Sequence, residues 1–253
     1  MLAGSGPLSA GLEGADLFRT VGAGVDGIFP PAMNSPARLP TRPFWLALGW
    51  GQPLGQPWAS YGAASLGGTV RAWRGAASVW HSGDDLYRET NITAAVARQV
   101  GGLFSAGASL GYASVAIPDL DHVEGVFLIG AILTAPLGEH SELSVWYAGL
   151  SLSSEKAYQS LTRQLFQLAL MARSGQATRW IAAVEKTPGY ELRQLAEVNL
   201  GAWRDITLQL GYRTSPGLPY AGARVPLGRT AVSLRVNLHP LFGLSTALGI
   251  SFK

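Results

Sequence analysis

The chain has 253 residues, and its 19 Lys or Arg and 16 Asp or Glu make charged residues only 14% of the sequence, where soluble domains usually carry about 25%. A hydrophobic fraction of 47% with a net charge of only +3 excludes an intrinsically disordered chain. Because cysteine is absent, disulfides and thiolate metal sites are excluded as well. The basic residues are scattered, so no nucleic-acid partner is expected, and no uncharged stretch is long and unbroken enough to predict a transmembrane helix.

Residues 1–42 differ in composition from the rest of the chain, because glycine, proline and alanine dominate them. Residues 12–20 have room for a short helix of one or two turns, and the prolines from Pro30 to Pro43 prevent any longer regular element. We expect this segment to be a plug or hatch, and residues 43–253 to form the main domain. Met1 to Gly11 lack the basic and apolar regions of a secretory signal, so no leader is visible.

From residue 43 onward, apolar and polar side chains alternate with a period of two, which is typical of strands with one apolar face. The pattern is clearest near the C-terminus, where Val232, Leu234, Val236 and Leu238 alternate with small or polar residues. Clusters of Gly, Pro, Asp and Ser mark the turns. We predict about fourteen strands, near residues 43–51, 57–66, 69–80, 89–100, 103–117, 123–135, 140–152, 158–173, 177–187, 191–201, 204–214, 218–227, 229–238 and 243–252.

Two all-β architectures fit this pattern. In a soluble sandwich, the polar face of each strand would meet water. Short connections, strands of about ten residues and low overall charge favour a transmembrane, antiparallel, up-and-down β-barrel with an N-terminal plug inside its lumen. The positions of six tryptophans, which lie mostly near segment ends, also favour a barrel with interfacial aromatic girdles. They are Trp45, Trp58, Trp80, Trp146, Trp180 and Trp203.

In such a barrel, the polar face of each strand would line the lumen. Its charged members have mixed signs, which favours a network that neutralises itself and packs against the plug over a pore lined by one sign. The alternative is a path for a solute. The predicted lumen network comprises Arg163, Arg173, Arg179, Glu185, Arg193, Glu197, Arg213 and Arg235.

Two segments have the residue spacing of catalytic motifs, but the sequence around each segment excludes the motif. Gly22, Gly24 and Gly27 have the dinucleotide-binding spacing, but no strand precedes them and Pro30 prevents the helix that should follow. The segment from Gly107 to Gly111 has the spacing of a nucleophile elbow, but its strand pattern continues without a helix.

Two polar clusters remain as weak candidates for chemistry. His81, Ser82, Asp84 and Asp85 resemble a hydrolase set in composition only. The acidic cluster over 119–124 is interpreted as a solvated turn in preference to a metal site. We therefore predict no enzyme, no cofactor and no metal.

Several short motifs resemble the FadL-like outer-membrane barrels, in particular the shorter PorV/PorQ-like branch associated with type IX secretion. Near the N-terminus the similar residues are Gly14, Ala15, and Arg19 to Gly24, followed by Asn34, Pro36, Ala37 and Leu39, with Ser35 inserted into the family's Asn-Pro-Ala-x-Leu signature. In the barrel they are Tyr87, Arg88, Glu89, Gly107, Tyr112, Gly211, Tyr212, Arg213, Gly222, His239, Pro240 and Gly243, with Phe252 near the end. The resemblance implies a fourteen-stranded barrel in a bacterial outer membrane, with the N-terminus folded inside. It also implies that the plug motif includes Gly22, Gly24, Asn34, Pro36, Ala37 and Leu39.

Two functions follow from the two branches of that family. A PorV/PorQ-like protein would be a non-enzymatic docking or anchoring component for secreted or surface proteins, with protein partners at its rim. A FadL-like protein would instead be a passive transporter of hydrophobic small molecules. Removing the 42 plug residues leaves 211, or about five per connection if each strand spans with about ten. Such short loops favour docking, with outer-membrane lipid as the surrounding partner.

Overall fold

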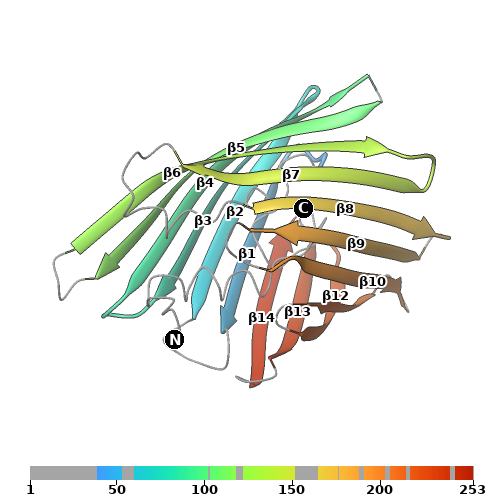
Figure 1. The fold of residues 1–253 in the computed structure, drawn as a ribbon. Coiled ribbons are helices and arrows are strands. Elements are labelled where there is room, and N and C mark those ends of the chain that lie inside the picture. The colour runs from blue at the N-terminus through green and yellow to red at the C-terminus, as the bar shows by residue number, and fades with distance from the viewer. Residues whose placement is uncertain are drawn as a thin grey trace.

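The computed structural model describes residues 39–52, 60–101, 103–117, 122–151, 165–175, 177–187, 191–202, 206–214, 217–239 and 243–252, without the side chains of 122–124 and 148–151. Its strands are β1 (Trp45–Gln52), β2 (Tyr61–Val70), β3 (Trp73–Gly83), β4 (Arg88–Val100), β5 (Phe104–Ile117), β6 (His122–Pro136), β7 (Ser141–Ser151), β8 (Leu165–Ser174), β9 (Thr178–Lys186), β10 (Arg193–Gly201), β11 (Thr207–Arg213), β12 (Leu218–Leu227), β13 (Thr230–His239) and β14 (Gly243–Phe252). Each strand pairs antiparallel with its neighbours in the sequence, and β1 pairs with β14. The fold is therefore a closed fourteen-strand barrel, as the sequence predicts, and Figure 1 shows β1 in blue beside β14 in red where it closes.

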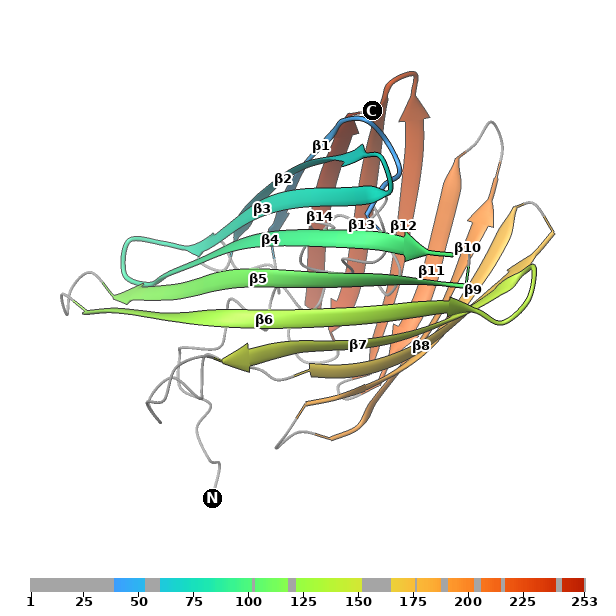
Figure 2. The same ribbon diagram turned by 90° about the horizontal axis from the view of Figure 1, so that it is seen from above.

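Closure satisfies the backbone of every strand, which is what a sheet needs if it is to cross a bilayer without a free edge. The pairing is regular except for a register shift on β6 between Ile129 and Gly130. Figure 2 shows β4, β5 and β6 lying side by side along one wall, and these are the longest strands. The described part of the chain contains no helix that is long and apolar enough to cross a membrane.

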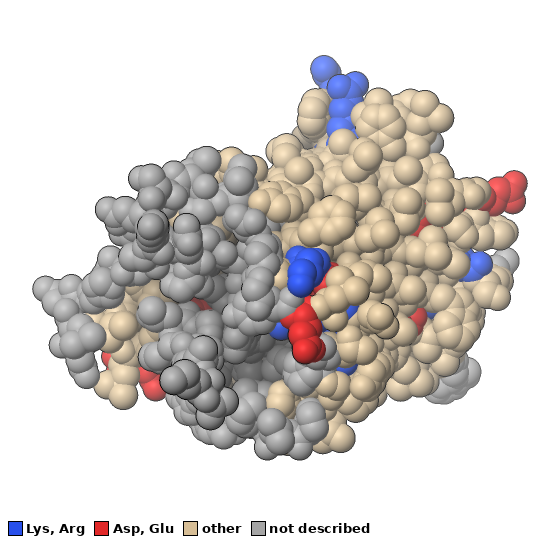
Figure 3. Space-filling model, in the orientation of Figure 1, with Lys and Arg blue, Asp and Glu red and all other residues tan. Residues whose placement is uncertain are grey.

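The period of two in the sequence becomes an inside and an outside of the wall. On β13, Leu234 and Leu238 are exposed on the outside, whereas Ser233, Arg235 and Asn237 are buried in the lumen. The same division holds around the barrel, so exposed Leu, Val, Ile and aromatic side chains cover the outer wall. Outside the grey atoms, the face in Figure 3 is largely uncharged. This apolar outer wall is the surface that a bilayer requires.

The two ends of the barrel differ in their connections. At one end, which we call the turn end, the strands are joined by residues 71–72, 101–103, 137–140, 175–177, 202–206 and 228–229, and β1 begins and β14 ends there. At the other end, the loop end, the connections are 53–60, 84–87, 118–121, 152–164, 187–192, 214–217 and 240–242. In outer-membrane barrels the short turns face the periplasm and the longer loops face outward.

The predicted bounds of two strands are wrong by three or four residues. The turn residues predict strands at 57–66 and 69–80, whereas β2 is Tyr61–Val70 and β3 is Trp73–Gly83. Gly67 and Gly68 suggested a turn, but both lie inside β2. A Cβ atom on Gly67 would overlap the ring of Trp45, so this glycine makes room for an aromatic side chain. The turn itself is Arg71 and Ala72, which carry no turn signal.

The expected tryptophan girdle is also corrected. Trp45, Trp80 and Trp146 are 0%, 1% and 2% exposed, because they lie on the lumen side of their strands. Trp180 is exposed on the outer wall. Trp58 and Trp203 lie outside the described residues. Position near a strand end is therefore not enough to predict an interfacial tryptophan, since the parity of the residue on its strand decides which side it faces.

Candidate functional site: the barrel lumen

A polar cluster on β10, β12 and β13 covers one part of the lumen wall. Glu197 accepts hydrogen bonds from the Tyr220 hydroxyl at 2.8 Å and from Asn199 Nδ2 at 2.7 Å. The guanidinium of Arg235 lies 3.8 Å from the centre of the Tyr220 ring, and its Nε donates to Asn237 Oδ1 at 3.1 Å. All five side chains are buried, and Arg235 is only 1% exposed. The stacking and hydrogen bonds offset part of the cost of burying this charge.

A glycine makes the contact between Tyr220 and Glu197 geometrically feasible. Gly211 on β11 lies directly between them in the ladder, because it pairs with Glu197 on one side and with Tyr220 on the other. A Cβ atom on Gly211 would overlap the Tyr220 ring. The ring can therefore lie flat over β11 and reach the carboxylate two strands away.

A second buried cluster lies on β8, β9 and β11. Arg213 Nη2 and Glu185 Oε2 form an ion pair of 3.4 Å in which both side chains are buried. Gln167 Nε2 donates to the other carboxylate oxygen of Glu185 at 2.5 Å. Each acidic side chain in this part of the lumen thus has a donor from another residue, and the two clusters carry charges of both signs.

The structure places the eight predicted network residues differently from one another. Glu185, Glu197, Arg213 and Arg235 are buried in the two clusters. Arg193 is half-buried and pairs with Glu185 in the β9–β10 register, with interactions of its own. Arg173 and Arg179 face each other across the β8–β9 hairpin at the turn end. Arg163 lies outside the described residues.

Aromatic and hydroxyl side chains line the lumen over β1 to β7, and the predicted site did not include them. Tyr61 and Trp80 contact each other with ring centres 6.3 Å apart. Hydrogen bonds link Ser65 to Ser78 at 3.0 Å, Thr93 to Asn91 at 2.7 Å and Thr134 to Ser144 at 3.1 Å. The alternation of Ser78, Trp80 and Ser82 on β3 was the available signal. It was weak because small residues occupy both faces of that strand.

Leu39 is the only residue of the predicted plug motif within the described part of the chain. It is 1% exposed and packs with Trp45, Ala76, Ala95 and Ala97 near the turn end. Its carbonyl oxygen accepts a hydrogen bond of 3.1 Å from Arg74 Nη1. Gly22, Gly24, Asn34, Pro36 and Ala37 lie outside the described residues. The chain therefore meets the inner wall at Leu39, just before β1 begins.

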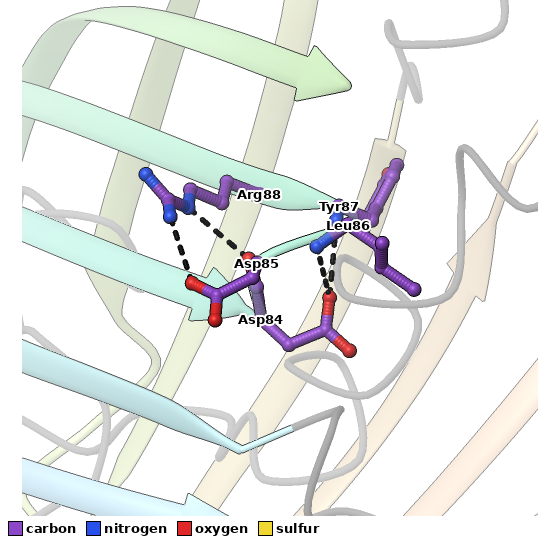
Figure 4. Close-up of polar contacts among 5 residues, drawn as sticks. All are labelled: Asp84, Asp85, Leu86, Tyr87 and Arg88. Atoms are coloured by element: carbon purple, nitrogen blue, oxygen red, sulfur yellow. Dashed lines mark hydrogen bonds and ion pairs between the residues drawn. The ribbon is translucent and has the colours of Figure 1, made fainter. Parts of the chain in front are cut away.

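The four residues that resemble a hydrolase set, His81, Ser82, Asp84 and Asp85, do not come together in the structure. His81 is exposed and contacts Thr90 Oγ1 at 2.9 Å, whereas Ser82 is buried on the opposite face of β3. In Figure 4, Asp84 instead organises the turn at the loop end, where its Oδ1 accepts from the backbone N–H groups of Leu86 and Tyr87 at 2.8 and 3.1 Å. These residues do not form a catalytic triad.

Tyr87 connects that turn to the lumen wall. Its hydroxyl donates to Glu89, which is buried on β4. Burial, together with this hydrogen bond and the negative charge of Glu89, raises the pKa of Tyr87. Within the described residues, no group of three or more His, Cys, Asp or Glu could hold a metal ion. The acidic cluster over 119–124 lies outside the part whose side chains are described.

No family model and no curated protein matches the sequence. Solved structures are similar in fold. The toluene transporter TbuX of Ralstonia pickettii matches with a TM-score of 0.66 and 9% identity, over 94% of this chain and 99% of TbuX. The toluene transporter TodX of Pseudomonas putida matches with a TM-score of 0.60 and 12% identity, over 93% and 97% of the two chains.

The outer-membrane protein Omp33 of Acinetobacter baumannii matches with a TM-score of 0.56 and 9% identity, over 84% of this chain and 98% of Omp33. At these identities the likeness extends to the fold. The protein is a closed fourteen-strand barrel of the kind found in bacterial outer-membrane proteins.

Proposed function

We propose that the protein is a non-enzymatic channel in a bacterial outer membrane, and that it passes small apolar molecules. The observation that carries this proposal is the composition of the lumen wall. Four buried charges, on Glu185, Glu197, Arg213 and Arg235, are held in the two clusters. Trp45, Trp80 and Trp146 line the wall over β1 to β7, where the buried Glu89 accepts a hydrogen bond from Tyr87. Aromatic rings and paired charges offer an apolar solute a surface without a strong field.

The size of the barrel supports passage. Eight strands enclose an interior that side chains can fill, and the enclosed space grows with the number of strands. Fourteen strands therefore leave room for a solute as well as for side chains. Two solved barrels with the same fold are described as toluene transporters, so monoaromatic hydrocarbons are the first class of solute to test.

The docking role that loop length favours is the weaker reading. Its basis is the short average connection, and the similar solved structures are transporters and other outer-membrane barrels. A PorV/PorQ-like role therefore stays a prediction from sequence resemblance. It would regain support if a protein partner co-purified in stoichiometric amount from native membranes.

Uptake of radiolabelled toluene by cells that lack their own hydrocarbon channel tests the proposal. We expect expression of the chain to speed toluene uptake several-fold and to leave uptake of a small sugar unchanged. Trp80→Ala, which changes the lumen, should alter toluene uptake. Trp180→Ala is the matched control on the outer wall and should not. Uptake no faster than in cells with an empty vector would refute transport of this class.

A further inference from the structure

The turn end of the barrel is basic on the side where the barrel closes. Arg42 precedes β1, Arg71 is in the β2–β3 turn, Arg98 is near the end of β4 and Arg229 is in the β12–β13 turn. These four, which we call the basic sector, are spread along the turn end of the wall, from the β12–β13 turn past β14 and β1 to β4. Figure 3 shows basic side chains at the upper tip of the molecule, where the β2–β3 hairpin ends in Figure 1.

Within the described residues, no acidic side chain at the turn end of these strands balances this charge. Among the described residues at the turn end of β12 to β14 and of β1 to β5, none is Asp or Glu, and no ion pair involves the four arginines. The loop end differs, because there Arg88 forms a 3.0 Å ion pair with Asp85 and lies beside Asp84. The four arginines therefore form a positively charged part of the described surface, which favours an anionic ligand.

The neighbours of these arginines are apolar and face the bilayer. Trp73 and Arg98 are paired in the β3–β4 register, and the guanidinium lies 5.2 Å from the centre of the ring. Val70 and Leu103, beside the same hairpin turns, are 74% and 73% exposed. Tryptophan, arginine and exposed aliphatic side chains in one place are typical of the boundary between acyl chains and headgroups.

Arg71 adds an observation from the backbone. It is the only residue other than glycine with a positive φ among the described residues, at 56°. Asn or Gly would adopt this turn conformation at lower cost. An arginine in a backbone conformation that favours Asn or Gly is a reason to look for a role of its side chain.

We propose that the basic sector binds the phosphate headgroups of anionic phospholipids in the leaflet at the turn end. A lipid fits better than a free anion because Val70, Trp73 and Leu103 would contact its acyl chains while Arg71 and Arg98 meet its phosphate. Each arginine close to an anionic membrane surface raises the affinity of a protein for anionic lipid about fivefold. Because this inference needs only the barrel and its bilayer, it stands or fails independently of the solute that the lumen passes.

Native mass spectrometry of the purified full chain tests this site, using micelles that contain equal amounts of phosphatidylglycerol and phosphatidylcholine. We expect the chain to retain phosphatidylglycerol preferentially. Arg71→Asn and Arg98→Gln should each lower that preference about fivefold. Arg88→Gln removes an arginine from the loop end and should leave the preference unchanged.

Two features make the outcome decisive. Arg71→Asn relieves the turn, so its thermal stability should hold or rise while lipid preference falls, which separates binding from folding. Excess inorganic phosphate should not displace the lipid. Equal retention of the two lipids, equal loss in Arg88→Gln, or displacement by phosphate alone would each overturn the proposal.

Discussion

Glycines in this barrel make room for aromatic rings that lie flat on the neighbouring strand. Gly211 is covered by Tyr220, Gly51 by Tyr61 and Gly67 by Trp45, and in each pair the two residues face each other in the ladder. A ring that covers the backbone of a glycine recovers the side-chain packing that the glycine lacks. Glycine is thus a packing residue at these three positions of the lumen wall.

Gly211→Ala is expected to destabilise the barrel by about 1–3 kcal/mol, because overpacking a filled site forces neighbours to shift. The added methyl group would overlap the Tyr220 ring and disturb its bond to Glu197. Gly75→Ala is the control, since a Cβ atom there meets nothing within 4 Å. Urea unfolding in vesicles measures both. Equal stability of the two variants would contradict this account of the glycines.

The buried ion pair gives a second prediction at this scale. Arg213→Ala should cost about 3 kcal/mol or more, because it leaves the buried Glu185 carboxylate without its arginine. Arg88→Ala removes the exposed pair with Asp85 and should cost less than about 1 kcal/mol. The same unfolding assay compares the two. A small effect of Arg213→Ala would mean that other donors replace the lost guanidinium.

At the scale of the strand, alternation predicted the fold well wherever the two faces differ in chemistry. The predicted strand at 243–252 matches β14, and 229–238 is within one residue of β13 at each end. The prediction was weaker at β2 and β3, where glycine and alanine occupy both faces and the turn at Arg71 has no glycine. The barrel and its inner face thus follow from local pattern.

The contacts within the lumen could not be predicted in the same way. Alternation places Glu197 and Arg235 on the inner face, but the ladder register decides that Tyr220 lies between them. The lumen tryptophans were assigned to girdles because strand ends were located to within a few residues, whereas facing changes with every residue. Long-range register is a property of the closed barrel, so no single strand encodes it.

The depth of a side chain on the outer wall should set the cost of charging it. Leu234 is in the middle of β13 and Leu227 is at the turn end of β12, and both are exposed on the outside. Leu234→Arg is expected to cost about 2–4 kcal/mol, and Leu227→Arg about 1 kcal/mol or less, as arginine is tolerated near the interface. Stability of the reconstituted variants measures the difference. Equal costs would place the bilayer midplane elsewhere on the wall.

For the whole molecule, the two ends of the barrel differ in their connections and in their charge. The turn end has the short connections, the basic sector and the point at which Leu39 enters the lumen. The short turns place this end in the periplasm. The loop end has the longer connections, including 152–164. If the protein passes a solute as we propose, the solute would enter past the loops and leave past the part of the inner wall that Leu39 contacts.

That attachment gives the last prediction. Arg74 holds Leu39 through its carbonyl oxygen at 3.1 Å and also donates to Ser105 Oγ at 3.4 Å, while Thr69 holds the Pro40 carbonyl at 3.2 Å. If the residues before Leu39 act as the plug that their composition predicts, Arg74→Ala should loosen it and raise the single-channel conductance in planar bilayers. The barrel itself should keep its thermal stability, because fourteen paired strands hold it.

Arg88→Ala removes an exposed arginine at the opposite end and is the control for a general effect of charge on ion flow. Its conductance should match that of the unchanged protein. Unchanged conductance in Arg74→Ala, together with unchanged stability, would show that the residues preceding Leu39 do not obstruct the lumen. Raised conductance with toluene uptake increased in parallel would instead place the barrier to the solute at the turn end, where the chain crosses from Leu39 into β1.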